Sequence, residues 1–293
     1  MLPDDVRSEL RYIEMYTAKR IRNLRIGAYT SRVAATGFDF REHRRYVAGD
    51  DVRRIDWNVT ARLRTPFVRL TDAERELNLI VALDVSPSMG FGSGPRSKRD
   101  AMLFIAGCLA FSALADRITI GFVAFADRVI GYFPPRTSRA YTWDVLDQLW
   151  SLDVAASRTL IAPVARQLVS RLKQTSLVCL VSDFLTPENL DDLADVKMLA
   201  ARHDVVSVVV DDPLEASLPD GSGTLRVRDM ESGRPTRLAL SDALRRRYRD
   251  SAEARRRELA QAFYRIPVDP VFVRADKSAV EPLLQLFLSR KVA

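Results

Sequence analysis

Predicted strands and helices alternate from residue 76 to the C-terminal end, and this alternation narrows the possible folds more than any other feature. The runs 77–83, 118–125, 177–181 and 205–210 are short and apolar, and segments with helical periodicity lie between most of them. Such alternation is typical of an α/β fold, in which helices cover both faces of a mostly parallel sheet. We therefore predict a doubly wound, Rossmann-like sheet.

Two hairpins are expected to interrupt this alternation. Residues 118–125 and 129–133 are separated by only Ala126-Asp127-Arg128, which predicts an antiparallel hairpin at one edge of the sheet. Pro134-Pro135 is predicted to end that hairpin. Turn sequences within 212–240 predict a second hairpin, inserted into the α/β domain.

The N-terminal quarter of the chain has a different character. Residues 4–25 show approximate helical spacing, and residues 28–75 are rich in arginine, glycine and aromatic residues. We expect residues 1–75 to form a helix and a small β-rich module, and residues 76–293 to form the α/β domain.

Composition bounds the class of protein. The chain has 293 residues, 47% of them hydrophobic, which fits a globular protein with a large core. Its net charge is +7. Cys108 and Cys179 lie in apolar segments, as reduced cysteines of cytosolic proteins do. The longest uncharged apolar run, residues 101–115, is too short to cross a hydrocarbon core of roughly 30 Å. We expect a cytoplasmic protein without a membrane span.

Oxygen-bearing side chains follow two of the predicted strands. Asp84, Ser86 and Ser88 come directly after the strand 77–83, Asp183 follows the strand 177–181, and Thr159 opens the helix predicted at 160–173. If the two strands are neighbours, all five side chains meet at one edge of the sheet. Such ligands suit a hard cation, Mg²⁺ or Mn²⁺. The alternative is structural, because Asp and Ser after a strand often cap the following turn.

The stretch Asp84-Val85-Ser86-Pro87-Ser88-Met89, with Thr159 and Asp183, resembles the metal-ion-dependent adhesion site of von Willebrand factor A-type domains. The resemblance implies a sheet ordered 3-2-1-4-5-6 with one antiparallel edge strand. It also implies that the hydroxyls ligate Mg²⁺, the aspartates act largely through water, and a partner's carboxylate completes the coordination. Two positions depart from that pattern: Arg158 stands where Gly is usual before the Thr, and Phe184 where Gly is common after the Asp.

A second signature lies upstream and includes Gly49-Asp50-Asp51, Arg53 and Asp56-Trp57. It resembles the bacterial family called domain of unknown function 58, which joins such a segment to an A-type domain. That resemblance implies an association with MoxR-type AAA+ ATPases. The residues themselves favour a salt-bridged turn with Trp57 as an apolar anchor. A second metal site from Asp50, Asp51 and Asp56 is the weaker alternative.

The candidate ligands predict a Mg²⁺-dependent protein-interaction module that binds an acidic residue of a protein partner. The family resemblance implies an adaptor or co-chaperone role, with a MoxR-type ATPase as the first partner to test. The chain has no P-loop and no nucleophile motif, so we predict no catalytic residues. Two alternatives remain. One is a metal-dependent phosphoester hydrolase, and the other is nucleic-acid binding through the arginine-rich helix 243–264.

Overall fold

The computed structural model describes residues 2, 4–20, 40–47, 50, 52, 55–71, 78–152, 158–189, 194–230 and 233–289. The chain forms two compact units. One, here called the sheet domain, consists of Met1–Val33 and Leu77–Ala293, and the other, the small module, consists of Ala34–Glu76. This division differs from the expected boundary after residue 75, because the N-terminal helix belongs to the sheet domain.

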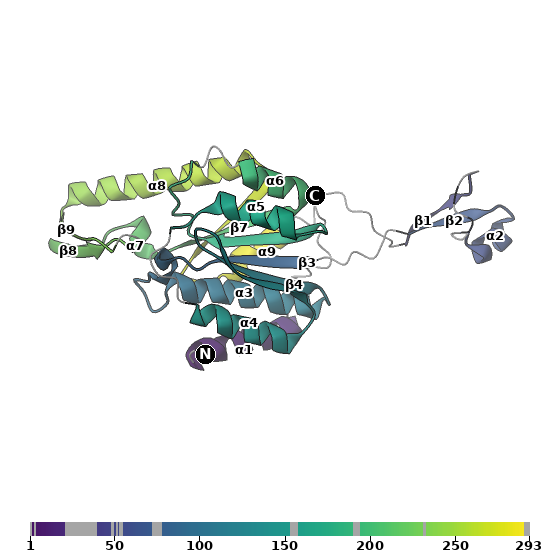
Figure 1. The fold of residues 1–293 in the computed structure, drawn as a ribbon, viewed down its shortest axis with the longest axis horizontal. Coiled ribbons are helices and arrows are strands. Elements are labelled where there is room, and N and C mark those ends of the chain that lie inside the picture. Colours follow the sequence, from purple (N-terminus) through teal and green to yellow (C-terminus); the bar gives the residue numbers. More distant parts are fainter. Residues whose placement is uncertain are drawn as a thin grey trace. The chain divides into compact units, whose positions relative to one another are not determined.

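The central sheet of the sheet domain has six strands in the predicted order 3-2-1-4-5-6. Figure 1 shows this sheet with α5, α6 and α8 on one side and α1, α3 and α4 on the other. Only the edge strand β5 is antiparallel to its neighbour. This confirms the predicted fold class and the predicted edge hairpin. From one edge to the other the strands are β10 (Val268–Arg274), β7 (Asp204–Asp211), β6 (Ser176–Ser182), β3 (Asn78–Asp84), β4 (Thr119–Phe125) and β5 (Val129–Arg136).

Strand β5 continues past the prolines that were expected to end it. Arg136 still pairs with Ile120 of β4. The prediction was wrong because β5 is an edge strand, where a proline on the solvent side removes no ladder hydrogen bond.

Helices cover both faces of the sheet, and each face has its own buried core. Alternate residues of β3 point to opposite cores: Leu79, Val81 and Leu83 to one, Ile80 and Ala82 to the other. The first core includes residues of α1 (Asp4–Arg20), α3 (Lys98–Ala115), α4 (Arg139–Ser151) and α9 (Val280–Ser289). The second includes residues of α5 (Ile161–Arg171), α6 (Ala194–Arg202) and α8 (Asp242–Tyr264).

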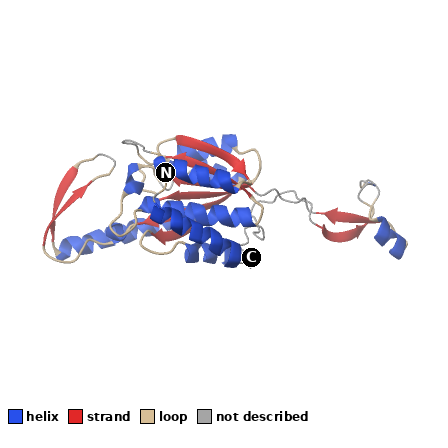
Figure 2. Ribbon diagram, turned by 90° about the horizontal axis from the view of Figure 1, so that it is seen from below, coloured by secondary structure: helices blue, strands red, loops and turns tan. Residues whose placement is uncertain are grey.

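A hairpin projects from one end of the sheet domain, beside the start of α8 (Figure 2). Its strands, β8 (Gly223–Arg228) and β9 (Pro235–Leu240), form a separate two-stranded sheet within the range expected for the inserted hairpin. The short helix α7 (Pro213–Ala216) precedes it, and Ser241 caps α8.

The small module contains β1 (Phe40–Arg45), α2 (Trp57–Leu63) and β2 (Phe67–Thr71), with β1 and β2 paired antiparallel. The N-terminal helix ends its described part at Arg20, so the predicted residues 21–25 lie outside the described residues. The described part of helix α6 begins at Ala194, and residues 190–193 before it also lie outside the described residues.

Candidate metal-binding site

The five predicted ligands lie at one edge of the sheet. Asp84 is the last residue of β3, and Ser86 and Ser88 lie in the loop and the short 3₁₀-helix η4 (Pro87–Gly90) that follow. Asp183 directly follows β6, which pairs in parallel with β3. Thr159 lies two residues before α5. The neighbouring strand ends therefore bring these segments together, as expected for ligand sites of open α/β sheets.

Four of the five side chains form one connected cluster. Thr159 Oγ1 lies 3.1 Å from Asp84 Oδ2 and 3.0 Å from Ser86 Oγ. Ser86 Oγ in turn lies 3.0 Å from Ser88 Oγ. All four residues are at most 5% exposed. A buried group of one carboxylate and three hydroxyls has the donor chemistry of a site for a hard divalent cation.

The alternative role of Asp84, capping the turn after the strand, is also partly observed. The backbone N–H of Ser86 donates to Asp84 Oδ1 at 2.9 Å, which is the turn-capping bond expected of an Asp after a strand. This bond uses one carboxylate oxygen and leaves the other facing the hydroxyls. Ser182, which the sequence analysis did not select, donates to that second oxygen, Asp84 Oδ2, at 2.6 Å. Its only signal in the sequence is a hydroxyl at the end of an apolar strand.

Asp183 stands apart from the other four ligands. Its Oδ2 accepts a hydrogen bond from Lys98 Nζ at 2.6 Å, and its Oδ1 accepts one from the backbone N–H of Leu185. The Lys98 ammonium also pairs with Glu215. The side chains of Lys98 and Asp183 are wholly buried. Asp183 is therefore held by a lysine rather than by the hydroxyl cluster.

Sequence reasoning missed Lys98 and Glu215. Lys98 is the first residue of α3, where the helix dipole disfavours a cation. A lysine at that position is a weak signal that its charge is needed elsewhere. Glu215 is the last acid of a capping box with Asp212 at the start of α7, and that pattern predicts only a local role.

The charges of the cluster are unbalanced around Asp84. Burial, together with the nearby charge of Asp183, raises the pKa of Asp84 to about 6, although hydrogen bonds from Ser182 and Ser86 oppose the shift. Burial alone would lower the pKa of Lys98, but the charges of Asp183 and Glu215 raise it above its ordinary value. Lys98 thus forms ion pairs with Asp183 and Glu215, whereas Asp84 has no ion pair among the described residues. A divalent cation would offset the electrostatic cost of burying the Asp84 carboxylate, so these residues fit Mg²⁺ or Mn²⁺.

The two positions that depart from the family pattern have different surroundings. Phe184 has a positive φ of 51°, a conformation that glycine adopts without strain. Its ring is 4% exposed and meets Phe263 edge-on at 5.1 Å, so burial offsets the backbone cost. Arg158 is exposed beside the buried Thr159.

The second signature is only partly visible, since Gly49, Asp51 and Arg53 lie outside the described residues. Asp50 pairs with Arg44 at 2.8 Å and accepts the backbone N–H of Val47. Asp56 caps α2. Both contacts support the salt-bridged turn over a second metal site. Trp57, however, is 69% exposed and does not anchor its own module.

No group of three or more His, Cys, Asp or Glu side chains comes together in the described ranges. The candidate site therefore depends on the hydroxyls of Ser86, Ser88 and Thr159 as much as on its carboxylates.

Solved structures share this architecture at low identity. A von Willebrand factor type A protein from Catenulispora acidiphila aligns with 75% of this chain and 43% of its own, at 13% identity and a TM-score of 0.47. Because that score is low, the fold class rests on this chain's own sheet order, which matches the order expected from the A-type resemblance.

The comparisons contradict the expected cytoplasmic location. One similar structure is described as an aerotolerance-related membrane protein from Bacteroides fragilis. It covers 74% of this chain and 98% of its own, at 16% identity and a TM-score of 0.45. A cytoplasmic location is therefore not assigned to this chain. No helix within the described residues is both long and apolar enough to cross a bilayer.

Similarity in sequence is more extensive. Uncharacterized protein Rv1480 of Mycobacterium tuberculosis is 28% identical over 284 residues, which are 96% of this chain and 89% of that protein. The family described as "Protein of unknown function DUF58" matches residues 42–258, a stretch that includes the upstream signature and all five candidate ligands. Because this match covers well over half of the sequence, the chain belongs to the DUF58 family.

Proposed function

We propose that this protein is a Mg²⁺-dependent protein-interaction module. The observation that carries the proposal is the buried Asp84 carboxylate, which the hydroxyls of Thr159 and Ser182 contact and no basic side chain of the described residues neutralises. Asp84, Ser86, Ser88 and Thr159 would hold Mg²⁺ or Mn²⁺, and Asp183 would contribute from the adjacent strand. The bound cation would offer a coordination position to a carboxylate of a partner protein.

We further propose that the partner is a MoxR-type AAA+ ATPase or its client, with this protein acting as an adaptor or co-chaperone. The support is the resemblance of residues 45–62 and of the candidate site to a family associated with such ATPases. A carboxylate ligand from the partner would make the interaction depend on both the metal and one acidic side chain.

The first test measures metal binding through stability. Mg²⁺ that binds only the folded protein should raise the Tm of the wild type by a few degrees when it is well above its Kd. Asp84→Ala should remove this response. Asp127→Ala is the matched control, since Asp127 lies just beyond β4, the other neighbour of β3, and pairs with Arg128. A Mg²⁺ response that persists in Asp84→Ala would contradict the proposal.

The second test measures the partner. A MoxR-type ATPase should be retained on the immobilised wild type in Mg²⁺ and released by EDTA, and Asp84→Ala should not retain it. Equal retention in all conditions argues against a metal-bridged contact. Hydrolysis of a phosphoester by the wild type in Mg²⁺, lost in Asp84→Ala, would instead favour the hydrolase alternative.

A further inference from the structure

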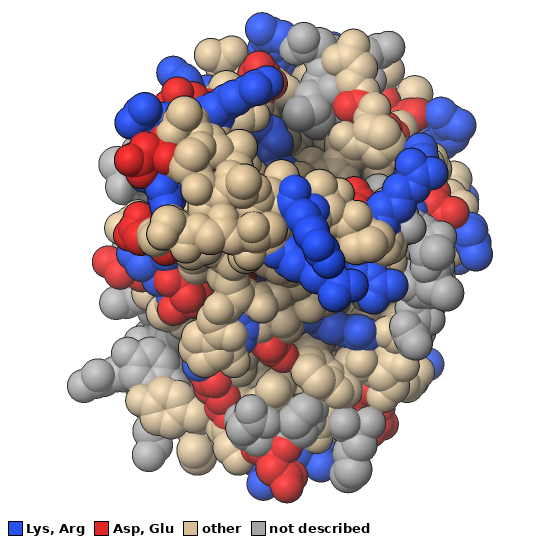
Figure 3. Space-filling model, turned by 90° about the vertical axis from the view of Figure 1, so that its left-hand side faces the viewer, with Lys and Arg blue, Asp and Glu red and all other residues tan. Residues whose placement is uncertain are grey.

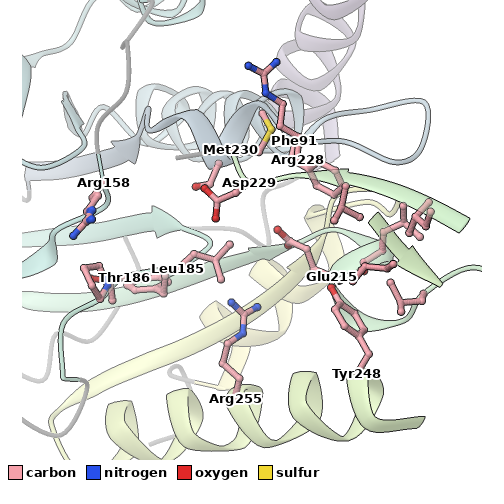
Figure 4. Close-up of a pocket in the computed structure, with 18 of the residues that line it drawn as sticks. Phe91, Arg158, Leu185, Thr186, Glu215, Arg228, Asp229, Met230, Tyr248 and Arg255 are labelled. Atoms are coloured by element: carbon pink, nitrogen blue, oxygen red, sulfur yellow. Dashed lines mark hydrogen bonds between the residues drawn. The ribbon is translucent and has the colours of Figure 1, made fainter. Parts of the chain in front are cut away.

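A groove lies beside the candidate metal site, at the end of the sheet domain that carries the hairpin. Its volume is about 1070 Å³, at the upper end of the range of small-molecule pockets and large enough for a short stretch of polypeptide. Its walls come from the loops after β3 and β6, from α7, from the hairpin and from α8 (Figure 4). Segments far apart in the sequence thus build a single surface.

The walls are largely apolar. Half-buried side chains from each of these elements line the groove: Phe91, Leu185, Leu214, Leu225, Leu238 and Tyr248. Leu225 and Leu238 are directly opposed across the hairpin, so the hairpin turns one apolar face to the groove. Tyr248 donates to the Leu214 carbonyl at 3.1 Å and so ties α8 to α7. These contacts hold the walls in place without a ligand.

Two arginines of the groove have no close ion pair, although the charge of Arg255 also acts on the nearby Asp211. Arg158 and Arg255 line the groove, and neither has an ion pair with a described residue. Figure 4 shows Arg255 reaching from α8 toward the space between Leu185 and Glu215. Figure 3 shows that lysine and arginine side chains gather on this end of the sheet domain.

The carboxylates of the groove are already engaged. Glu215 pairs with Lys98, and Glu188 accepts the backbone N–H groups at the start of α5. Asp229, the third, is exposed at the rim and also has an interaction within the chain. The arginines therefore favour an acidic ligand, and the apolar walls favour one that also carries apolar side chains.

The groove reaches the candidate metal site directly. Ser88 belongs to both, and Phe184, next to Asp183, also lines the groove. We infer that the groove binds a segment of a partner protein that combines acidic and apolar side chains, with one carboxylate at the Ser88 end and another near Arg255. This inference rests on the proposed function for the first carboxylate only. Aromatic, Met and Arg side chains such as those in the groove are typical of protein interfaces.

Fluorescence anisotropy of labelled synthetic peptides tests the inference on the full chain. Three peptides of equal length are compared: one alternating Leu and Glu, one with Lys in place of Glu, and one with Ser in place of Leu. We expect only the Leu–Glu peptide to bind. Arg255→Glu should weaken that binding by about tenfold or more, because the reversed charge repels the ligand. Arg249→Glu, on the same helix but outside the groove, should not change it.

The outcomes separate this inference from the proposed function. Binding that is lost in Arg255→Glu but unchanged by EDTA and by Asp84→Ala supports the groove and contradicts the metal-bridged contact. Binding that depends on metal but not on Arg255 contradicts the groove and leaves the metal site standing. Failure of the Leu–Glu peptide to bind, or equal binding of the Leu–Glu and Leu–Lys peptides, overturns the inference. So does displacement of the peptide by an oligonucleotide with steep salt dependence, which would assign the groove to nucleic acid.

Discussion

At the scale of single residues, Lys98 organises the charges next to the candidate metal site. Its ammonium is completely buried and lies between Asp183, which directly follows β6, and Glu215, which lies in α7. A buried ion is expensive unless its partners remain in place. Lys98 therefore holds Asp183 close to Asp84 and leaves Asp84 as the carboxylate that lacks a cation.

Replacing this lysine should destabilise the protein strongly. Lys98→Met would leave Asp183 and Glu215 buried without their counter-charge, and we expect the free energy of unfolding to fall by about 3–5 kcal/mol. The exposed Lys277→Met should change it by less than about 0.5 kcal/mol. Urea unfolding of both variants measures the difference. Equal stability of the two would show that the carboxylates do not need the ammonium.

His203 should make stability depend on pH. It is 2% exposed, its Nδ1 accepts the backbone N–H of Ser176 at 3.3 Å, and burial, helped by Arg202, lowers its pKa below 6.5. As the pH falls, the unfolded chain therefore takes up a proton at His203 before the folded protein does. The contribution of His203 to the free energy of unfolding is thus present above about pH 6.5 and is lost as the pH falls below it. In His203→Asn, whose Oδ1 can still accept the Ser176 amide, this loss should be absent.

The measurement compares unfolding free energies of wild type and His203→Asn at about pH 7.5 and about pH 5.5. The comparison with the variant is needed because Asp84 makes the free energy of unfolding change with pH in the opposite direction to His203. Its folded pKa of about 6 lies above the ordinary 3.8, so its contribution increases as the pH falls through 6. The variant should gain stability relative to the wild type at the lower pH. An unchanged difference would show that His203 keeps its ordinary pKa.

At the scale of secondary-structure elements, α1 is a structural part of the sheet domain. Leu2, Val6 and Leu10 are buried in the core that α3 and α4 share with the sheet. Gly107 of α3 permits this close packing, because a side-chain carbon there would collide with Leu10. The apolar spacing of residues 4–25 predicted a helix but gave no indication of which surface it would cover.

Truncation within α1 should therefore weaken the sheet domain. Leu10→Ala removes a fully buried side chain, and we expect a loss of about 2–5 kcal/mol in the free energy of unfolding. Met15→Ala, on the same helix but 59% exposed, should cost less than about 0.5 kcal/mol. Thermal or denaturant unfolding followed by the signal of the sheet domain tests this. Identical midpoints for the two variants would mean that α1 does not contribute to the core.

At the scale of the whole molecule, the two units differ in how much core they have. Both large buried clusters consist entirely of sheet-domain residues. In the described part of the small module only Val68 is fully buried, and Val47, Val52, Trp57 and Leu63 are more than half exposed. The sheet domain thus contains its own cores and all five candidate ligands.

Removing the small module should spare the sheet domain. A chain in which a Gly-Ser linker replaces Ala34–Glu76 should still unfold cooperatively, because no residue of the two large buried clusters has been lost. If Mg²⁺ binds as proposed, its stabilising effect should also persist. Differential scanning calorimetry with and without Mg²⁺ measures both properties. Loss of the cooperative transition would show that the sheet domain depends on the module.

The sequence alone indicated most strands of the central sheet, several of the helices and the order of that sheet. These follow from local periodicity, and from the resemblance of residues 84–89, with Thr159 and Asp183, to A-type domains. It also predicted that Asp84, Ser86, Ser88, Thr159 and Asp183 lie together, because the loops at the ends of parallel strands share one edge. The first four do form one cluster, and Asp183 is held by Lys98 instead.

Only the tertiary structure decided which cation holds Asp183, where α1 packs and how the groove is enclosed. The contact between Lys98 and Asp183 spans 85 residues, and the one between Lys98 and Glu215 spans 117. The groove joins loops, a hairpin and a helix between residues 88 and 255. Such contacts depend on how distant segments pack in three dimensions, and short-range patterns of apolar and polar residues do not encode them.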